Sequence, residues 1–136
     1  MSIRPAFARG ILAGTKKVEF RRRPPRQNPR IALIYATAPV GQLVGLFEIL
    51  SVKGATPQTL WRRYRGVAGI DRKSFMGYFA GCSRGFAIEI GDVYELSRPV
   101  SLAELITVKH APPSFTYLPG AVVRRLASEV GFSPGI

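Results

Sequence analysis

The sequence predicts an α+β fold, a small curled sheet or β-barrel of five or six strands with short helices outside it. Alternating and β-branched apolar segments recur along the 136 residues. The helical segments between them are short, and few are long enough for the crossovers that a parallel sheet needs. An apolar content of 46% is enough for a core, and the length fits a single domain over residues 1–136.

The first predicted element is a helix over Pro5–Ala13. Pro5 suits the first turn, where its missing N–H costs nothing, and Phe7 and Ile11 recur at helical spacing. Gly14 is well placed to end the helix in the left-handed conformation.

A strand with a charged face is predicted to follow the helix. Val18 and Phe20 fall on one side of the alternating segment, and Lys17, Glu19 and Arg21 fall on the other. Lys16 lies where the turn meets the strand. Strict alternation places Lys16 opposite Glu19, but a residue in the turn can also swing toward a cleft, so the direction of its side chain stays open.

Further strands are predicted after a proline-rich exposed loop at residues 23–30. The β-branched apolar segments 31–37 and 42–52 predict two central strands. Residues 84–90 and 93–96 predict a hairpin, with Gly91 and Asp92 forming its turn.

Two short helices are predicted between these strands. Thr56 and Pro57 provide a cap and a first-turn proline for a helix that ends near Gly66. Asp71 can cap a second helix, which ends before Gly81. Residues 112–118 read as extended chain, and residues 120–130 predict a terminal helix with an apolar stripe.

The positive charge of the chain is local and favours an anionic partner. Residues 1–30 hold nine Lys or Arg against Glu19, a net +8 of the whole-chain +12. Clustered cations gain affinity for phosphates by releasing counterions, so nucleic acid is the leading partner; the alternative is a basic surface that only keeps the protein soluble. No segment has the length of a membrane span, and no basic helix has a clean apolar face.

Metal and redox chemistry find little support in the composition. Cys82 is the single cysteine and His110 the single histidine, which together fall short of a structural zinc site. We therefore expect no metal, no cofactor and a reducing, cytoplasmic location without a secretion signal.

The segment Gly14-x-Lys16-x-x-Glu19-x-Arg21 resembles the G-x-K-x-x-E-x-R signature of ASCH domains, which are relatives of the PUA-like RNA-binding barrels. The surroundings agree, because residues 2–5 resemble the Ser-Ile-Lys-Pro entry into the first helix of this family, and residues 112–118 resemble its closing segment.

The resemblance implies a PUA-like barrel with a cleft beneath the signature strand that holds RNA or a nucleotide, in proteins often given a regulatory role. Some similar proteins are hydrolases, including ribonucleases and an amidohydrolase of acetylated cytidine. In that amidohydrolase the signature lysine acts with a threonine at the position of Glu19. A carboxylate cannot replace a hydroxyl nucleophile, so that activity is not carried over.

Lys16, Glu19 and Arg21 are the main candidates for a site. A lysine with its ordinary pKa of about 10.4 is a cation at pH 7, so Lys16 suits phosphate binding, and catalysis would require a lowered pKa. Glu19 either pairs with Arg21 on the surface, worth under about 1 kcal/mol, or orients Lys16 and Arg21 and accepts a proton from the ligand. The planar guanidinium of Arg21 suits phosphate.

Further ligand-binding candidates surround these three. Lys17 and Arg22 add positive charge beside Lys16. Tyr35 can stack on a base, although an aromatic in such a strand more often belongs to the core. Ser114 either borders the cleft or satisfies a turn. Residues 61–65 interleave aromatic and basic side chains, which fits either single-stranded nucleic acid or a helix with one buried face.

The sequence thus predicts an RNA- or nucleotide-binding module centred on Lys16, Glu19 and Arg21. The alternative is a hydrolase of RNA or modified nucleosides, with Lys16 and Glu19 as its catalytic residues. A third interpretation is an interaction protein that forms a homodimer through the terminal helix at residues 120–130.

Overall fold

The computed structural model describes residues 1–101 and has a five-stranded mixed sheet with three short helices. The strand order is β1-β3-β4-β5-β2, in which only β1 and β3 are parallel. The elements in chain order are β1 (Ser2–Ile3), α1 (Pro5–Ala13), β2 (Val18–Arg21), β3 (Ile31–Ala36), β4 (Gln42–Ala55), α2 (Pro57–Tyr64), α3 (Arg72–Tyr78) and β5 (Gly85–Val100).

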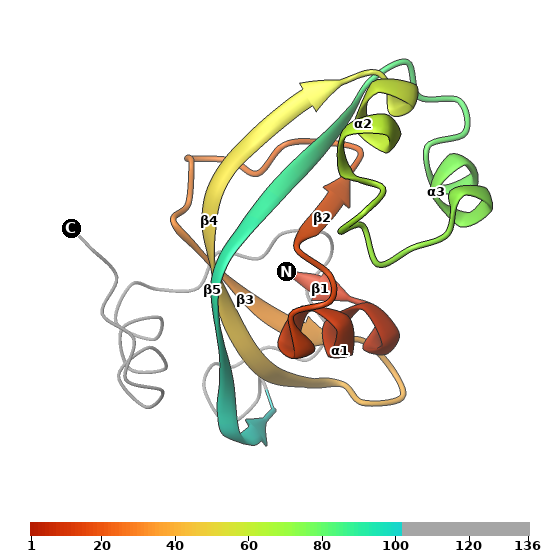
Figure 1. The fold of residues 1–136 in the computed structure, drawn as a ribbon. Helices are drawn as coiled ribbons and strands as arrows, with labels where there is room; N and C mark the ends of the chain where they lie inside the picture. Colours follow the sequence, from red (N-terminus) through yellow and green to blue (C-terminus); the bar gives the residue numbers. More distant parts are fainter. Residues whose placement is uncertain (102–136) are drawn as a thin grey trace.

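The long strands β4 and β5 bend through the middle of the molecule (Figure 1). The same view shows α2 and α3 together at one end of this pair, whereas α1 lies beside β1. The α+β class, the five strands and the short peripheral helices predicted from the sequence are therefore confirmed.

The predicted helix ends are also confirmed, because local signals set them. Pro5 occupies the first turn of α1, and Gly14 ends it with a φ of +82°. The Thr56 hydroxyl accepts a hydrogen bond from the backbone N–H of Thr59, and the Asp71 carboxylate accepts one from the N–H of Ser74.

The predicted hairpin at residues 84–96 is wrong. β5 is one continuous strand that passes through Gly91 and pairs with β4, and bulges near Ile49 absorb its bend. Gly91 provides close packing instead of a turn: a β-carbon there would lie 2.5 Å from the Glu48 carboxylate and 2.8 Å from the Leu50 side chain.

The charged face predicted for β2 is present but buried, as are all four residues of the strand. Val18 and Phe20 pack into an apolar cluster under α2 and α3, with Leu60, Phe75 and Phe79 among its members. The opposite face carries Glu19 and Arg21, which are buried with Lys16. A second cluster joins α1, β1 and β3.

Several predictions concern residues that lie outside the described part of the chain. They are the extended segment at residues 112–118 with Ser114, and the helix and dimer contact at residues 120–130. Within residues 1–101, no helix has the length and apolar character required to cross a bilayer.

Candidate functional site

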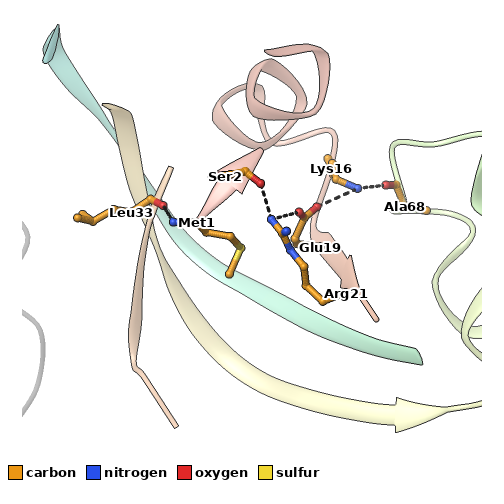
Figure 2. A network of polar contacts seen from close by, with 7 residues as sticks. All are labelled: Met1, Ser2, Lys16, Glu19, Arg21, Leu33 and Ala68. Atoms are coloured by element: carbon orange, nitrogen blue, oxygen red, sulfur yellow. Dashed lines mark hydrogen bonds and ion pairs between the residues drawn. The ribbon is translucent and has the colours of Figure 1, made fainter. Parts of the chain in front are cut away.

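A tight turn between α1 and β2 sets the position of Lys16. The backbone N–H groups of Thr15 and Lys16 both donate to the Gly10 carbonyl oxygen at 3.0 Å. This turn directs the Lys16 side chain inward, toward the same side as Glu19 (Figure 2). The direction left open by the alternation of the strand is therefore toward the cleft.

The ammonium of Lys16 lies in a buried, partly aromatic setting. The residue is only 2% exposed, and its Nζ donates a hydrogen bond of 2.6 Å to the Ala68 carbonyl oxygen. The Phe7 and Phe20 rings lie 4.9 and 5.4 Å from Nζ, within the range of cation–π attraction. Burial lowers the pKa of Lys16 below its ordinary value; the charge of Glu19 opposes this shift and that of Arg21 adds to it.

Glu19 lies between the two cations. One carboxylate oxygen is 3.8 Å from the Lys16 Nζ, and the other is 2.9 Å from the Arg21 Nη2. The surface pair considered from the sequence is thus a buried three-residue network, for which the usual value of exposed ion pairs does not hold.

Arg21 also bridges the two edges of the sheet. Its Nη2 donates a 2.6 Å hydrogen bond to the Ser2 carbonyl oxygen, so a side chain of β2 holds the backbone of β1 (Figure 2). β1 is fixed on its other side by β3, where the Tyr35 N–H donates to the Met1 carbonyl oxygen at 2.9 Å. The Met1 amino group donates to the Leu33 carbonyl oxygen at 2.8 Å, and burial, aided by the charge of Arg21, lowers its pKa to about 5.

The network borders a cavity of about 460 Å³, within the usual size of small-molecule sites. Its lining comes from β1, α1, β2 and α3, so segments distant in the sequence meet there. On the rim, the Arg22 Nε donates to the Tyr78 carbonyl oxygen at 2.9 Å, and its guanidinium lies 4.2 Å from the centre of the Tyr78 ring. Burial raises the pKa of Tyr78, whose phenol can donate a hydrogen bond.

The cavity favours an anion that also offers a proton donor. Two buried cations face a single carboxylate, which leaves one net positive charge, and the exposed side chains of Arg4 and Arg22 add to it. Lys16 and Arg21 can only donate hydrogen bonds, whereas Glu19 accepts them. Among residues 1–101, no three His, Cys, Asp or Glu side chains gather as a metal site would require.

The structure brings four of the predicted residues to one cavity and leaves others away from it. Lys16, Glu19, Arg21 and Arg22 line the cavity. Lys17 is exposed and absent from its lining, and Tyr35 packs in an apolar cluster with Leu43, Leu46, Leu96 and Val100. A ligand-binding role for each of these residues stays a prediction, as it does for Ser114.

Several residues of the site, in the cavity lining or in contact with Lys16, were not predicted from the sequence. The carbonyl groups of Ser2 and Ala68 carry no sequence signal, because every residue has one. Tyr78 and Ser74 were missed because they come from α3, whose approach to β2 depends on tertiary packing. The aromatic pair of Phe75 and Phe79, four residues apart, was the available sign that α3 packs on the core.

Gly69 holds Lys16 in place, and its substitution is expected to impair the site. Its φ is +63°, and a β-carbon there would lie 2.8 to 3.1 Å from three carbons of the Lys16 side chain. Gly69→Ala should therefore displace the ammonium and weaken ligand binding or turnover by about tenfold or more, since misplacement near 1 Å can cost about 100-fold.

Gly81→Ala is the matched control for this change. Gly81 has a φ of +80°, but a β-carbon there would meet no atom within 4 Å. Both variants therefore carry the backbone strain of about 1–2 kcal/mol, and only Gly69→Ala contacts Lys16. Thermal melts and an RNA binding or cleavage assay separate the two effects. Equal function in both variants would show that Gly69 does not position Lys16.

The fold and the site define a small PUA-like α+β protein with a cavity between the two edge strands of its sheet. Residues 1–107 match the family model for the ASCH domain, and the chain belongs to that family.

Relatives of known structure agree with this assignment. The chain is 32% identical over 132 residues to an ASCH domain-containing ribonuclease from Zymomonas mobilis, covering 94% of this chain and 88% of the relative. The crystal structure of ASCH from Zymomonas mobilis superposes with a TM-score of 0.85, covering 97% of this chain and 94% of that one. A Ser-to-Ala variant of that protein superposes with a TM-score of 0.84 at 32% identity, covering 94% and 92% of the two chains.

Proposed function

We propose that this protein is a ribonuclease that cleaves the RNA backbone at the cavity bordered by Lys16, Glu19 and Arg21. The observation that carries the proposal is the buried network itself, in which a carboxylate and two cations face one cavity. The 32% identity to an ASCH ribonuclease over nearly the whole chain supports RNA as the substrate.

The cavity residues have the chemistry for such a cleavage. Arg21 donates hydrogen bonds to a non-bridging phosphate oxygen and stabilises the charge that builds there. Glu19 takes the proton of the ribose 2′-hydroxyl, whose oxygen attacks phosphorus as the bond to the 5′-oxygen breaks. Lys16 gives its proton to the departing 5′-oxygen, and the lowered pKa makes it a stronger acid than an exposed lysine.

A second candidate function is binding of RNA or a nucleotide without turnover. It is favoured by the contacts that the network already makes, because the Lys16 ammonium contacts Ala68 and Glu19, and the Arg21 guanidinium contacts Ser2 and Glu19. Groups held this firmly are preorganised for binding, but they must exchange partners before they move protons.

Incubation of purified protein with end-labelled single-stranded RNA is expected to give shorter products bearing a 2′,3′-cyclic phosphate. RNA with 2′-O-methyl groups throughout should remain intact, because it lacks the nucleophile. Lys53→Ala is the matched protein control, since Lys53 is an exposed lysine of β4 that does not line the cavity. Tight binding of unmodified RNA without any product would exclude cleavage and leave the binding function.

A further inference from the structure

The positive charge of the described chain lies in two segments. Besides residues 1–30, the segment from residue 56 to residue 84, here called the α2–α3 segment, has six Lys or Arg and one acid, a net +5. Residues 31–55 hold one charge of each sign, and residues 85–101 hold three acids and one Arg, a net −2. The α2–α3 segment is therefore strongly basic, whereas the chain segments on either side of it are neutral or acidic.

The cations of this segment point into solvent. α2 buries Pro57, Leu60 and Tyr64, which leaves its basic residues on the exposed face. All six are exposed: Arg62, Arg63, Arg65, Arg72, Lys73 and Arg84. Trp61, which the sequence also offered as a stacking surface, packs on Phe75 at 5.2 Å between ring centres, so its ring contributes to the core.

The single acid of the segment, Asp71, cancels only one of these six positive charges. The Asp71 carboxylate accepts hydrogen bonds from the Ser74 backbone N–H at 2.7 Å and from the Ser74 hydroxyl at 3.2 Å. It is thus engaged as the cap of α3.

The same segment forms one wall of the cavity. Ala68 accepts the hydrogen bond of Lys16, and Ile70 and Ser74 line the cavity. Arg72 and Lys73 fall between those two lining residues in the chain. An RNA strand with one nucleotide in the cavity would therefore have these two exposed cations near its neighbouring nucleotides.

We propose that the exposed cations of the α2–α3 segment form a second RNA-binding surface, which holds the phosphates of nucleotides flanking the one in the cavity. The inference rests on the proposed function in taking RNA as the ligand. Its consequence is a preference for RNA strands of several nucleotides over mononucleotides, because short ligands fill the cavity and leave this surface empty.

A purely structural role predicts a different result. Arg62 and Arg63 lie in the last turn of α2, where cations stabilise the partial negative charge of the helix end. On that basis their loss would lower the melting temperature and leave RNA affinity unchanged.

The test compares Arg62→Gln/Arg63→Gln/Arg65→Gln with the wild type by fluorescence anisotropy. The probes are an uncleavable 2′-O-methyl RNA of about 12 nucleotides and a labelled dinucleotide. For the longer probe, the slope of log affinity against log salt should decrease by about 2, at about 0.7 for each phosphate that the variant no longer neutralises. Its affinity at low salt should fall by about tenfold or more. Dinucleotide binding should stay at the wild-type level.

Two controls isolate charge and position. Arg62→Lys/Arg63→Lys/Arg65→Lys keeps the three charges and should keep the salt slope. Arg98→Gln removes an exposed cation of β5 and should leave the slope within about 0.7 of the wild-type value. The proposal would be overturned if the variant with three glutamines kept the wild-type salt slope. It would also be overturned if the variant with three lysines lost as much of the slope as the variant with three glutamines. Wild-type binding to phosphatidylserine vesicles as tight as to RNA, with the same dependence on the three arginines, would also overturn it.

Binding and cleavage are scored separately, so the two proposals can fail independently. If the wild type binds the long probe through the three arginines but never cleaves RNA, this inference stands and the ribonuclease proposal is wrong. If instead the wild type cleaves RNA and the variant with three glutamines binds the long probe as tightly as the wild type, the ribonuclease proposal stands and this inference is wrong.

Discussion

Lys16→Met is expected to reduce RNA cleavage by about 100-fold or more, because it removes a proton donor and charge from the cavity. The fold should survive, since methionine fills similar space between Gly10 and Gly69 and Glu19 remains paired with Arg21 at 2.9 Å. The Ala68 carbonyl loses its partner, but a desolvated ammonium also disappears. The free energy of unfolding should therefore change by only about 1 kcal/mol.

A pH series adds a signature that is specific to Lys16. Its pKa is lowered in the folded protein from 10.5, so between the folded pKa and 10.5 the unfolded chain binds more protons than the folded one. In that window wild-type stability rises with pH. The wild type should therefore gain stability relative to Lys16→Met as the pH approaches 10.5, and the difference should be constant at lower pH.

Denaturant unfolding at several pH values and a cleavage assay measure both effects. Lys53→Met is the control, because Lys53 is exposed on β4 away from the cavity and should show neither the lost activity nor the pH-dependent difference. A Lys16→Met protein that is folded and fully active would remove Lys16 from the mechanism.

Local chemistry explains which parts of the fold could be predicted from the sequence. Pro5 and Gly14 bound α1, and Thr56 and Asp71 begin the next two helices through bonds within one turn. The hairpin prediction failed because Gly91 and Asp92 carry the composition of a turn. Pairing between β4 and β5 spans distant residues and overrides that local signal.

The site was predictable only in part for a similar reason. The spacing of Lys16, Glu19 and Arg21 identified the three charged residues, but not their burial. Burial follows from Ala68 meeting Lys16 and from Ser2 meeting Arg21 across the sheet edges. Contacts between elements that are distant in the sequence have no periodic signal.

Glu19→Gln is expected to have the largest effect on stability. The carboxylate is the shared partner of Lys16 and Arg21, all three are buried, and the charge of Glu19 opposes the lowering of the Lys16 pKa. Neutralising it leaves two buried cations without an anion. The free energy of unfolding should fall by about 3–5 kcal/mol, the usual cost of breaking a buried ion pair from one side. Denaturant unfolding at pH 7 measures this loss.

Glu95→Gln is the matched control, because Glu95 is exposed on β5 and its neutralisation should change stability by only about 0.5 kcal/mol. The double variant Lys16→Met/Glu19→Gln tests the cause directly. Since it removes one of the two unpaired cations, it should recover about 1–3 kcal/mol relative to Glu19→Gln alone. Additive effects of the two substitutions would mean that the Glu19 carboxylate does not stabilise the Lys16 ammonium. In that case the 3.8 Å contact between them would carry no energy, and Arg21 alone would account for the burial of Glu19.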